Sequence, residues 1–328
     1  MPDQLVYAME VFLNGLMAGV LYALVALGFV LIYKASGIFN YAQGVMALFA
    51  AMTLVGIMDG QIPFSHLINA ILGTDLHHFG WHLPAFLGIL LTMAVMVLLA
   101  WLVQRIIFKH LVGQEPIILF MATIGLAYFM EGMGDMMWGA DIKKLDVGLP
   151  QGINIWIDET TFNIFDYGFF IDNLDIVATV IAIILVGVLV AFSQYTKEGR
   201  AMRAVADDHQ AALSVGVSLN FIWIMVWSLA GFVALVAGGM WGAKSGVQFS
   251  LSLIALKALP VLMLGGFTSI PGAIIGGLII GVGEKLFEFT VGPLIGGATE
   301  NWFAYVLALL FLVFRPQGLF GEKIIERV

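Results

Sequence analysis

Long runs of apolar residues, separated by short polar segments, dominate the pattern along this chain. Most of these runs reach the roughly 20 residues that a helix needs to cross about 30 Å of hydrocarbon. Three of them are shorter, so the total is eight or nine spans, the lower number with a re-entrant segment. The pattern predicts an all-α fold, a polytopic transmembrane helical bundle. Its candidate spans lie near 8–33, 40–58, 85–107, 116–138, 175–195, 220–242, 253–267, 270–289 and 302–314.

The composition supports this interpretation and excludes several classes of protein. Of the 328 residues, 61% are hydrophobic and only 11% are charged, whereas about 25% are charged in a typical soluble domain. The net charge of −8 argues against nucleic acid as a partner. The chain has no Cys, which excludes disulfides, thiolate metal sites and Cys nucleophiles. No linker or low-complexity tract divides the chain, so we expect a single transmembrane domain, residues 1–328, in contact with membrane lipid.

Basic residues predict the orientation, because loops rich in Lys and Arg stay in the cytoplasm. The opposite side is acidic, and its longest loop covers residues 139–174. The first apolar run lacks a basic leader and a cleavage site, so we expect it to be kept as a span. The pattern therefore predicts a periplasmic N-terminus and a cytoplasmic C-terminus. In the nine-span arrangement the basic residues on one side are Lys34, Arg105, Lys109, Lys197, Arg200, Arg203, Arg315, Lys323 and Arg327.

A charged segment at about 197–218 interrupts the apolar pattern on the cytoplasmic side. Its sequence, KEGRAMRAVADDHQAALSVGV from Lys197, has good helix formers and no Pro between Gly199 and Val215. Gly216 stands where a helix C-cap would lie. Small residues recur at helical spacing and form a narrow face. Two interpretations stay open here: an ordinary solvated helix, or a helix that docks into a groove of another protein.

Four short motifs resemble those of a known family. The segment QAALSVG (Gln210 to Gly216) resembles the EAA-x-x-x-G coupling segment of bacterial ATP-binding-cassette importer permeases. KALPVLMLGGFTSIPGAIIGG (from Lys257), FRPQGLFG (from Phe314) and GIFNYAQGVMAL (from Gly37) are similar to segments of the branched-chain amino acid, or Liv-type, permeases. They follow the family order from residue 37 to 321, so the resemblance covers nearly the whole chain.

The resemblance implies a multi-pass permease in the bacterial inner membrane, without enzymatic activity of its own. It implies four kinds of partner: a second homologous permease subunit, two ATP-binding-cassette ATPase subunits, a periplasmic substrate-binding protein and lipid. It implies no cofactor on this chain, since ATP and Mg belong to the ATPase subunits. The residues that it assigns to coupling with the ATPases are Gly199, Arg200, Arg203, Asp208, Gln210, Ala211, Ala212 and Gly216.

Polar residues and helix breakers within the spans are candidates for the translocation path, because charges and broken helices are rare there without a function. Each also has a structural alternative. Asn40 and Gln43 could cap a helix, and Glu131 and Lys257 could form a structural pair or contact a second permease. The GxxxG spacings after Gly272 favour close helix packing, while Glu284, Lys285 and Glu288 are expected to approach the outer interface, where they snorkel or pair locally. The path candidates are Asn40, Gln43, Glu131, Lys257, Gly265, Gly266, Pro271 and Gly272.

Other chemistries find little support in the sequence. Four His residues between 66 and 82 have no helical or carboxylate spacing that favours a metal, so we expect no metal site. No zinc-protease, serine-hydrolase or phosphate-loop motif occurs, which argues against an intramembrane enzyme. Glu131 and Asp135, one helical turn apart, keep an ion-coupled secondary carrier as an alternative. The favoured substrates are the branched-chain amino acids Leu, Ile and Val, with urea, short-chain amides or other amino acids next.

Overall fold

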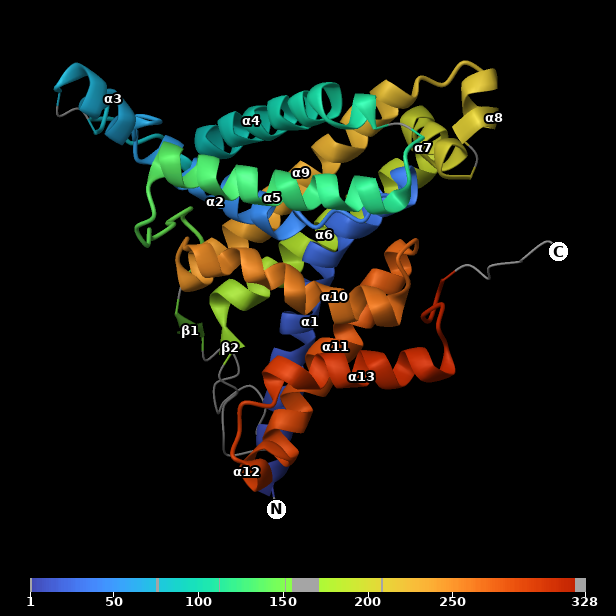
Figure 1. The fold of residues 1–328 in the computed structure, drawn as a ribbon. Coiled ribbons are helices and arrows are strands. Elements are labelled where there is room, and N and C mark those ends of the chain that lie inside the picture. The colour runs from blue at the N-terminus through green and yellow to red at the C-terminus, as the bar shows by residue number, and fades with distance from the viewer. Residues whose placement is uncertain are drawn as a thin grey trace. The chain divides into compact units, whose positions relative to one another are not determined.

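Helices make up almost all of the computed structural model, which describes residues 2–74, 77–111, 113–150, 152–154, 171–207 and 209–321. This confirms the predicted all-α fold. A single two-stranded antiparallel ladder, Ile153 with Asp172 and Asn154 with Ile171, occurs among the described residues. The elements are α1 (Pro2–Ser36), α2 (Gln43–Met58), α3 (Ser65–Leu72), α4 (Ala85–Ile106), the 3₁₀ helix η1 (Phe108–His110), α5 (Pro116–Trp138), β1 (Ile153–Asn154), β2 (Ile171–Asp172), α6 (Asn173–Tyr195), α7 (Lys197–Asp207), α8 (His209–Ser214), α9 (Leu219–Ser245), η2 (Phe249–Leu253), α10 (Ile254–Gly265), α11 (Ile270–Thr290), α12 (Gly292–Ile295) and α13 (Glu300–Phe314) (Figure 1).

The apolar helices correspond one to one with the nine predicted segments. Within the described residues, six helices are long and apolar enough to cross a membrane: α1, α4, α5, α6, α9 and α11. The remaining three apolar segments are the short ones, α2, η2 with α10, and α13. The 16 residues of α2 extend only about 24 Å at 1.5 Å per residue. A helix of that length does not cross the hydrocarbon alone, which is why its neighbours must enclose it.

The chain forms two compact units, each assembled from separated segments. Unit 1 consists of the described parts of residues 1–30, 149–188 and 256–328. Unit 2 consists of those of residues 31–148 and 189–255. The sequence predicted one transmembrane domain over residues 1–328. Nothing in it indicated the two units, because its composition does not change where the chain passes from one unit to the other.

The centre of unit 2 is α2, which is apolar on every side and buried along nearly its whole length. A helix of this kind must be surrounded by others, and α4, α5 and α9 pack around it (Figure 1). Close packing depends on glycine: a Cβ on Gly238 of α9 would lie 2.1 Å from the carbonyl oxygen of Ala47. Trp138 donates from Nε1 to Thr53 Oγ1 at 3.2 Å, so the hydroxyl group of α2 has a hydrogen-bond partner.

The segment after α5 is fastened to unit 2 by a partly buried lysine. Lys143 exchanges backbone hydrogen bonds with Val247, and its Nζ donates to Gln61 Oε1 at 2.6 Å and to the carbonyl of Trp138. Burial lowers the pKa of Lys143 below its ordinary value, and the nearby charges of Asp59 and Asp141 oppose that shift. The beginning of the acidic 139–174 loop is therefore ordered, while residues 151 and 155–170 lie outside the described structure.

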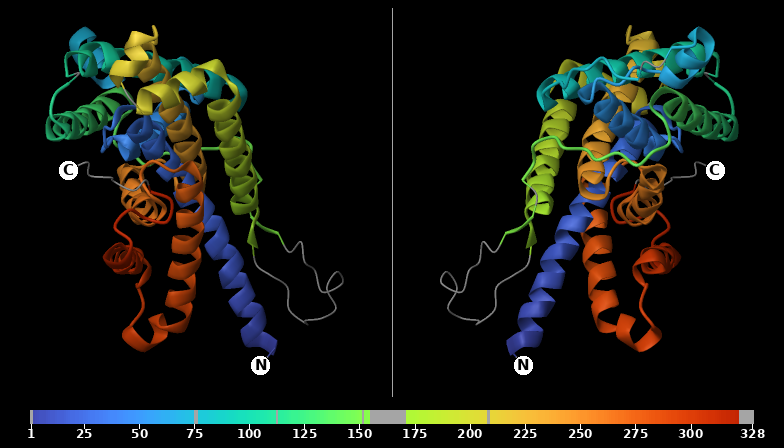
Figure 2. Two further views of the ribbon diagram at one scale, coloured as in Figure 1. Left: turned by 90° about the vertical axis from the view of Figure 1, so that its right-hand side faces the viewer. Right: turned by 90° about the vertical axis from the view of Figure 1, so that its left-hand side faces the viewer.

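In unit 1, α1 and α11 approach each other through glycines on both helices (Figure 2). A Cβ on Gly277 would lie 2.5 Å from the carbonyl oxygen of Gly19, and one on Gly281 would lie 2.5 Å from that of Gly15. The GxxxG spacing of α11 thus faces a GxxxG spacing of α1, Gly15 to Gly19. The expected close helix packing is confirmed.

This packing predicts that Gly277→Ala destabilises the protein. The added methyl group meets rigid backbone, and overpacking of this kind typically costs about 1–3 kcal/mol. Gly125→Ala on α5 is the matched control, because nothing lies within 4 Å of the corresponding Cβ position. Thermal unfolding of the purified variants in one detergent checks the difference, and equal midpoints for the two variants would contradict it.

Candidate functional site

Two of the motifs meet at the turn between α10 and α11 in unit 1. The backbone N–H of Leu319 donates to the carbonyl of Leu264 at 2.8 Å, and that of Phe320 donates to Gly265 at 3.2 Å. The carbonyl groups that α10 leaves unpaired at its end are thus satisfied by the segment after α13. Non-helical backbone within a membrane domain needs such partners, and here the C-terminal motif provides them.

The same turn is closed by glycine and by a serine cap. Cβ atoms on Gly265 and Gly272 would lie 2.1 Å and 2.2 Å from each other's carbonyl oxygens, so only glycine fits at either position. Gly266 has a φ of +100°, in the region that glycine adopts without strain. Ser269 Oγ accepts from the N–H of Gly272 at 3.0 Å, and Pro271 lies in the first turn of α11. These four path candidates therefore form one tightly fitted turn.

Lys257, a further path candidate, forms an ion pair with Glu284. Its Nζ lies 2.6 Å from Glu284 Oε1 and donates to the carbonyl of Glu300 at 2.7 Å. Glu284 is only 1% exposed and also accepts from the hydroxyl of Tyr22 at 3.4 Å. The sequence predicted that Glu284 snorkels or pairs locally near the outer interface. In the structure it does not snorkel, because it is buried in the ion pair with α10, beside Tyr22 of α1. Lys285 pairs locally with Glu300 at 2.7 Å, as the sequence predicted for this end of α11.

A buried ion pair fixes positions more than it adds stability, because each charge has to leave water. The pair joins the middle of α10 to α11 and, through Glu300, to the first residue of α13. Glu284 Oε2 has no hydrogen-bond partner within the described residues. Neither Tyr22 nor Glu284 was a candidate from the sequence, since a charge in a span indicates that a partner exists but not which residue it is.

Asn40 and Gln43 lie at the non-helical break between α1 and α2, in unit 2, and both are fully buried. Asn40 Nδ2 donates to Gln43 Oε1 at 3.2 Å, and Asn40 Oδ1 accepts from the N–H of Ala42. Gln43 Nε2 donates to the carbonyl of Ala230 on α9 at 3.3 Å. Thr123 of α5, which the sequence did not indicate, bonds both the N–H of Tyr41 and the carbonyl of Phe39. These side chains thus bond backbone groups of the α1–α2 break and of α9, and Asn40 also bonds Gln43.

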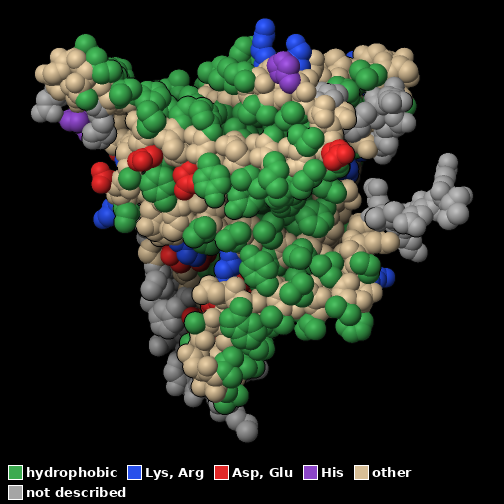
Figure 3. Space-filling view, in the orientation of Figure 1, with side chains coloured by type: hydrophobic (Ala, Val, Ile, Leu, Met, Phe, Trp, Pro, Cys, Tyr) green, Lys and Arg blue, Asp and Glu red, His purple; other side chains and the backbone are tan. Residues whose placement is uncertain are grey.

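Glu131 and Asp135 share one side of α5, as the helical spacing predicted. Glu131 is partly buried and Asp135 is exposed. Neither forms an ion pair with any residue that the structure describes. Figure 3 shows a few acidic side chains within the largely hydrophobic surface over α5, next to the exposed Tyr128 and Phe129. Of all path candidates, Glu131 is the charged group without a partner of opposite charge in the described structure.

The predicted coupling segment is helical on both sides of residue 208, which lies outside the described residues: α7 precedes it and α8 follows it. The two helices pack on each other, and α7 also contacts α9. Gly199 packs against the end of α6, since a Cβ there would lie 2.3 Å from the carbonyl oxygen of Phe192. Arg200 Nη1 donates to the carbonyl of Tyr195 at 3.4 Å. Arg203 is partly buried, and Asp208 lies outside the described residues, as does the side chain of Gln210.

The end of α8 has the predicted glycine cap. Gly216 has a φ of +88°, its N–H donates to Leu213, and the N–H of Val217 donates to Ala212. This is the Schellman arrangement, which satisfies the last carbonyls of a helix. Ala212 is 2% exposed and packs inward, which corrects the expectation that it lies on the docking face. Exposed residues at this end of the segment are Ala211 and Leu213 (52% exposed) of α8, and Val215 (77% exposed) in the turn after it.

Comparison with known proteins extends these observations to the whole chain. The chain is 26% identical to the high-affinity branched-chain amino acid transport system permease protein LivH of Salmonella typhimurium, and 26% identical to LivH of Escherichia coli (strain K12). It is 27% identical to the protein of the same description, BraD, of Pseudomonas aeruginosa. Each alignment covers 100% of both chains.

The family comparison covers the glycine-fitted turn, the α1–α2 break and the capped α8 together. Residues 11–315 match the family described as branched-chain amino acid transport system, permease component. Three of the four motifs that carried the resemblance lie within this range, at the places where the described backbone leaves a helix. This multi-pass membrane protein therefore belongs to the permease family of branched-chain amino acid transport systems.

Proposed function

We propose that this chain is the permease subunit of an ATP-driven importer whose substrates are the branched-chain amino acids Leu, Ile and Val. The observation that carries the proposal is the full-length similarity to LivH and BraD, which are described as high-affinity permeases for these solutes. At 26–27% identity a related solute is the second candidate. Urea, a short-chain amide or another amino acid would then replace Leu, Ile and Val.

In this proposal the chain performs no covalent chemistry. Two separate ATPase subunits supply the energy, a second permease subunit completes the path, and a periplasmic binding protein delivers the solute. Two observations support an ATPase contact at α7 and α8. Leu213 and Val215 are exposed apolar side chains in an otherwise charged segment, and exposed apolar groups of this kind indicate a protein contact. Gly216 fixes the end of α8 and hence the direction of that surface.

The path candidates divide into groups with different proposed roles. Gly265, Gly266, Pro271 and Gly272 form a close-fitted turn, and Lys257 with Glu284 holds the helices on both sides of it. We assign these residues to the moving framework of unit 1. Asn40 and Gln43 hold the break between α1 and α2. Glu131 lies on α5 without an ion-pair partner among the described residues, and it is the residue that we assign to a contact with solute or with the second permease.

Stimulated ATP hydrolysis is the experiment that tests the proposed function. The permease, reconstituted in proteoliposomes with its ATPases, its second permease and the binding protein, should hydrolyse ATP faster when Leu, Ile or Val is added. If only urea or acetamide stimulated hydrolysis, the proposed substrates would instead be urea and short-chain amides. Uptake that needs a proton or sodium gradient and ignores ATP would instead support an ion-coupled carrier, and would overturn the proposal.

The ATPase contact predicts a specific defect in Leu213→Asp. A carboxylate at an apolar contact has to lose water, so co-purification of the ATPases should fall by about tenfold, the equivalent of roughly 1.4 kcal/mol. The matched control is Ile71→Asp on α3, where the original side chain is 73% exposed. The two variants should insert in the membrane equally. Undiminished ATPase binding and stimulation in Leu213→Asp would remove the coupling role from α8.

The proposed orientation predicts opposite labelling of two introduced cysteines. The natural chain has none, so each label reports a single site. Cys at the exposed position of Pro150 should react with an impermeant maleimide added from the periplasmic side, whereas Cys at the exposed position of Ala204 should react only after the membrane is opened. The reverse pattern would invert the topology, with N-terminus and C-terminus exchanged.

A further inference from the structure

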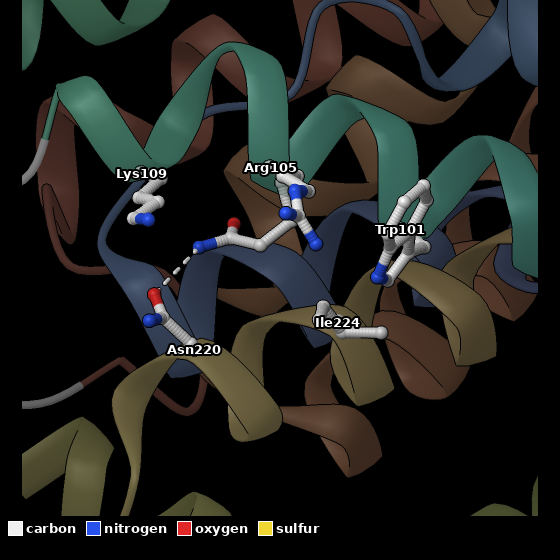
Figure 4. A pocket seen from close by; sticks show the side chains of 6 residues that line it. Trp101, Arg105, Lys109, Asn220 and Ile224 are labelled. Carbon is white, nitrogen blue, oxygen red and sulfur yellow. Dashed lines mark hydrogen bonds between the residues drawn. The ribbon is translucent and has the colours of Figure 1, made fainter.

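A pocket of about 250 Å³ lies between α4 and α9, within unit 2. Its walls are Trp101, Gln104, Arg105 and Lys109 from α4 and η1, and Asn220 and Ile224 from α9 (Figure 4). It lies where the apolar span 85–110 ends and the apolar span 219–245 begins. These span ends place the pocket at the boundary between hydrocarbon and water.

The charge of the pocket is positive. Arg105 and Lys109 are one helical turn apart, both are exposed, and neither forms an ion pair with a described residue. Among the six lining residues there is no Asp or Glu. Asn220 is in the first turn of α9, where backbone N–H groups and the helix dipole favour an anion. Two cations and a helix N-terminus face one open space, which suits a phosphate group.

One polar atom of a buried side chain in the wall lacks a partner among the described residues. Gln104 is only 2% exposed, and its Nε2 donates to Asn220 Oδ1 at 3.5 Å, the contact that is dashed in Figure 4. Its Oε1 has no hydrogen-bond partner within the described residues. Native proteins seldom leave such an atom unsatisfied. A ligand with a hydroxyl group in addition to a phosphate would satisfy it.

The surroundings favour a lipid over a free anion as the source of that phosphate. Trp101 lies under the guanidinium of Arg105, 5.1 Å from the ring centroid to Cζ, and Trp at this depth is typical of the membrane interface. Leu98, Leu102 and Phe221 are exposed apolar residues on the same two helices. They provide a surface for acyl chains next to the pocket.

We infer that the pocket binds the headgroup of an anionic glycerophospholipid with hydroxyl groups, such as phosphatidylglycerol. Arg105 and Lys109 bind the phosphate, Asn220 bonds the headgroup at the start of α9, and Gln104 Oε1 accepts a headgroup hydroxyl. Basic pockets between transmembrane helices are a recurring form of lipid recognition. The lipid then connects the end of α4 to the beginning of α9.

Native mass spectrometry of the purified full-length chain tests the site. Dioleoyl phosphatidylglycerol is compared with dioleoyl phosphatidylcholine, which has the same acyl chains without the net charge or the hydroxyls. Each of Arg105→Gln and Lys109→Gln should weaken phosphatidylglycerol binding by about fivefold. Lys144→Gln, an exposed cation outside the pocket, should have no effect. Gln104→Leu keeps both cations and should reduce binding of phosphatidylglycerol but not that of phosphatidylcholine.

Three results would overturn the inference. One is equal binding of both lipids by the natural protein, and another is an unchanged preference in the Arg105 and Lys109 variants. The third is displacement of phosphatidylglycerol by an excess of inorganic phosphate as effectively as by the lipid itself, which would identify a soluble-anion site. Thermal unfolding of each variant without lipid separates a lost site from a lost fold, and the single substitutions at exposed positions are the ones expected to fold normally.

Discussion

Backbone groups that leave a helix inside a hydrocarbon layer must find hydrogen-bond partners within the protein, and this constraint accounts for most of the short motifs. At residues 37–42 the partners are side chains: Asn40 bonds the N–H of Ala42, and Thr123 bonds Tyr41 and Phe39. At the α10–α11 turn they are backbone groups of Leu319 and Phe320. Backbone groups freed at each break thus form hydrogen bonds with a segment far away in the sequence. A substitution that removes one partner leaves the polar group of the other without a hydrogen bond.

Glycine makes these contacts possible because, without a side chain, it allows two backbone segments to approach each other closely. Gly265 and Gly272 each lie where a Cβ would overlap a carbonyl group, as do Gly19 and Gly277 between α1 and α11. Lys257 and Glu284 join α10 to α11 by an ion pair. Unit 1 therefore combines close backbone contacts between helices with one buried charged link.

The sequence predicted the spans well because apolar length is a local property, and each of the nine segments has its helix. It also predicted the cap at Gly216 and the glycine packing of α11, since both depend on residues a few positions apart. The predictions from the sequence failed where contacts between distant elements determine whether a side chain is buried. The burial of Glu284 depends on α1, α10 and α13, and the inward position of Ala212 depends on the packing of α8.

The beginning of α9 is the element that two surfaces of unit 2 have in common. Asn220 lines the basic pocket, and α7, next to the exposed apolar side of α8, contacts the same helix. Gly238 further along α9 fits against Ala47 of α2 without space for a side chain. Because one continuous helix makes these contacts, the position of its first turn and the fit of Gly238 against α2 are not independent. The polar end of α9 and the buried centre of unit 2 are thus parts of one packing arrangement.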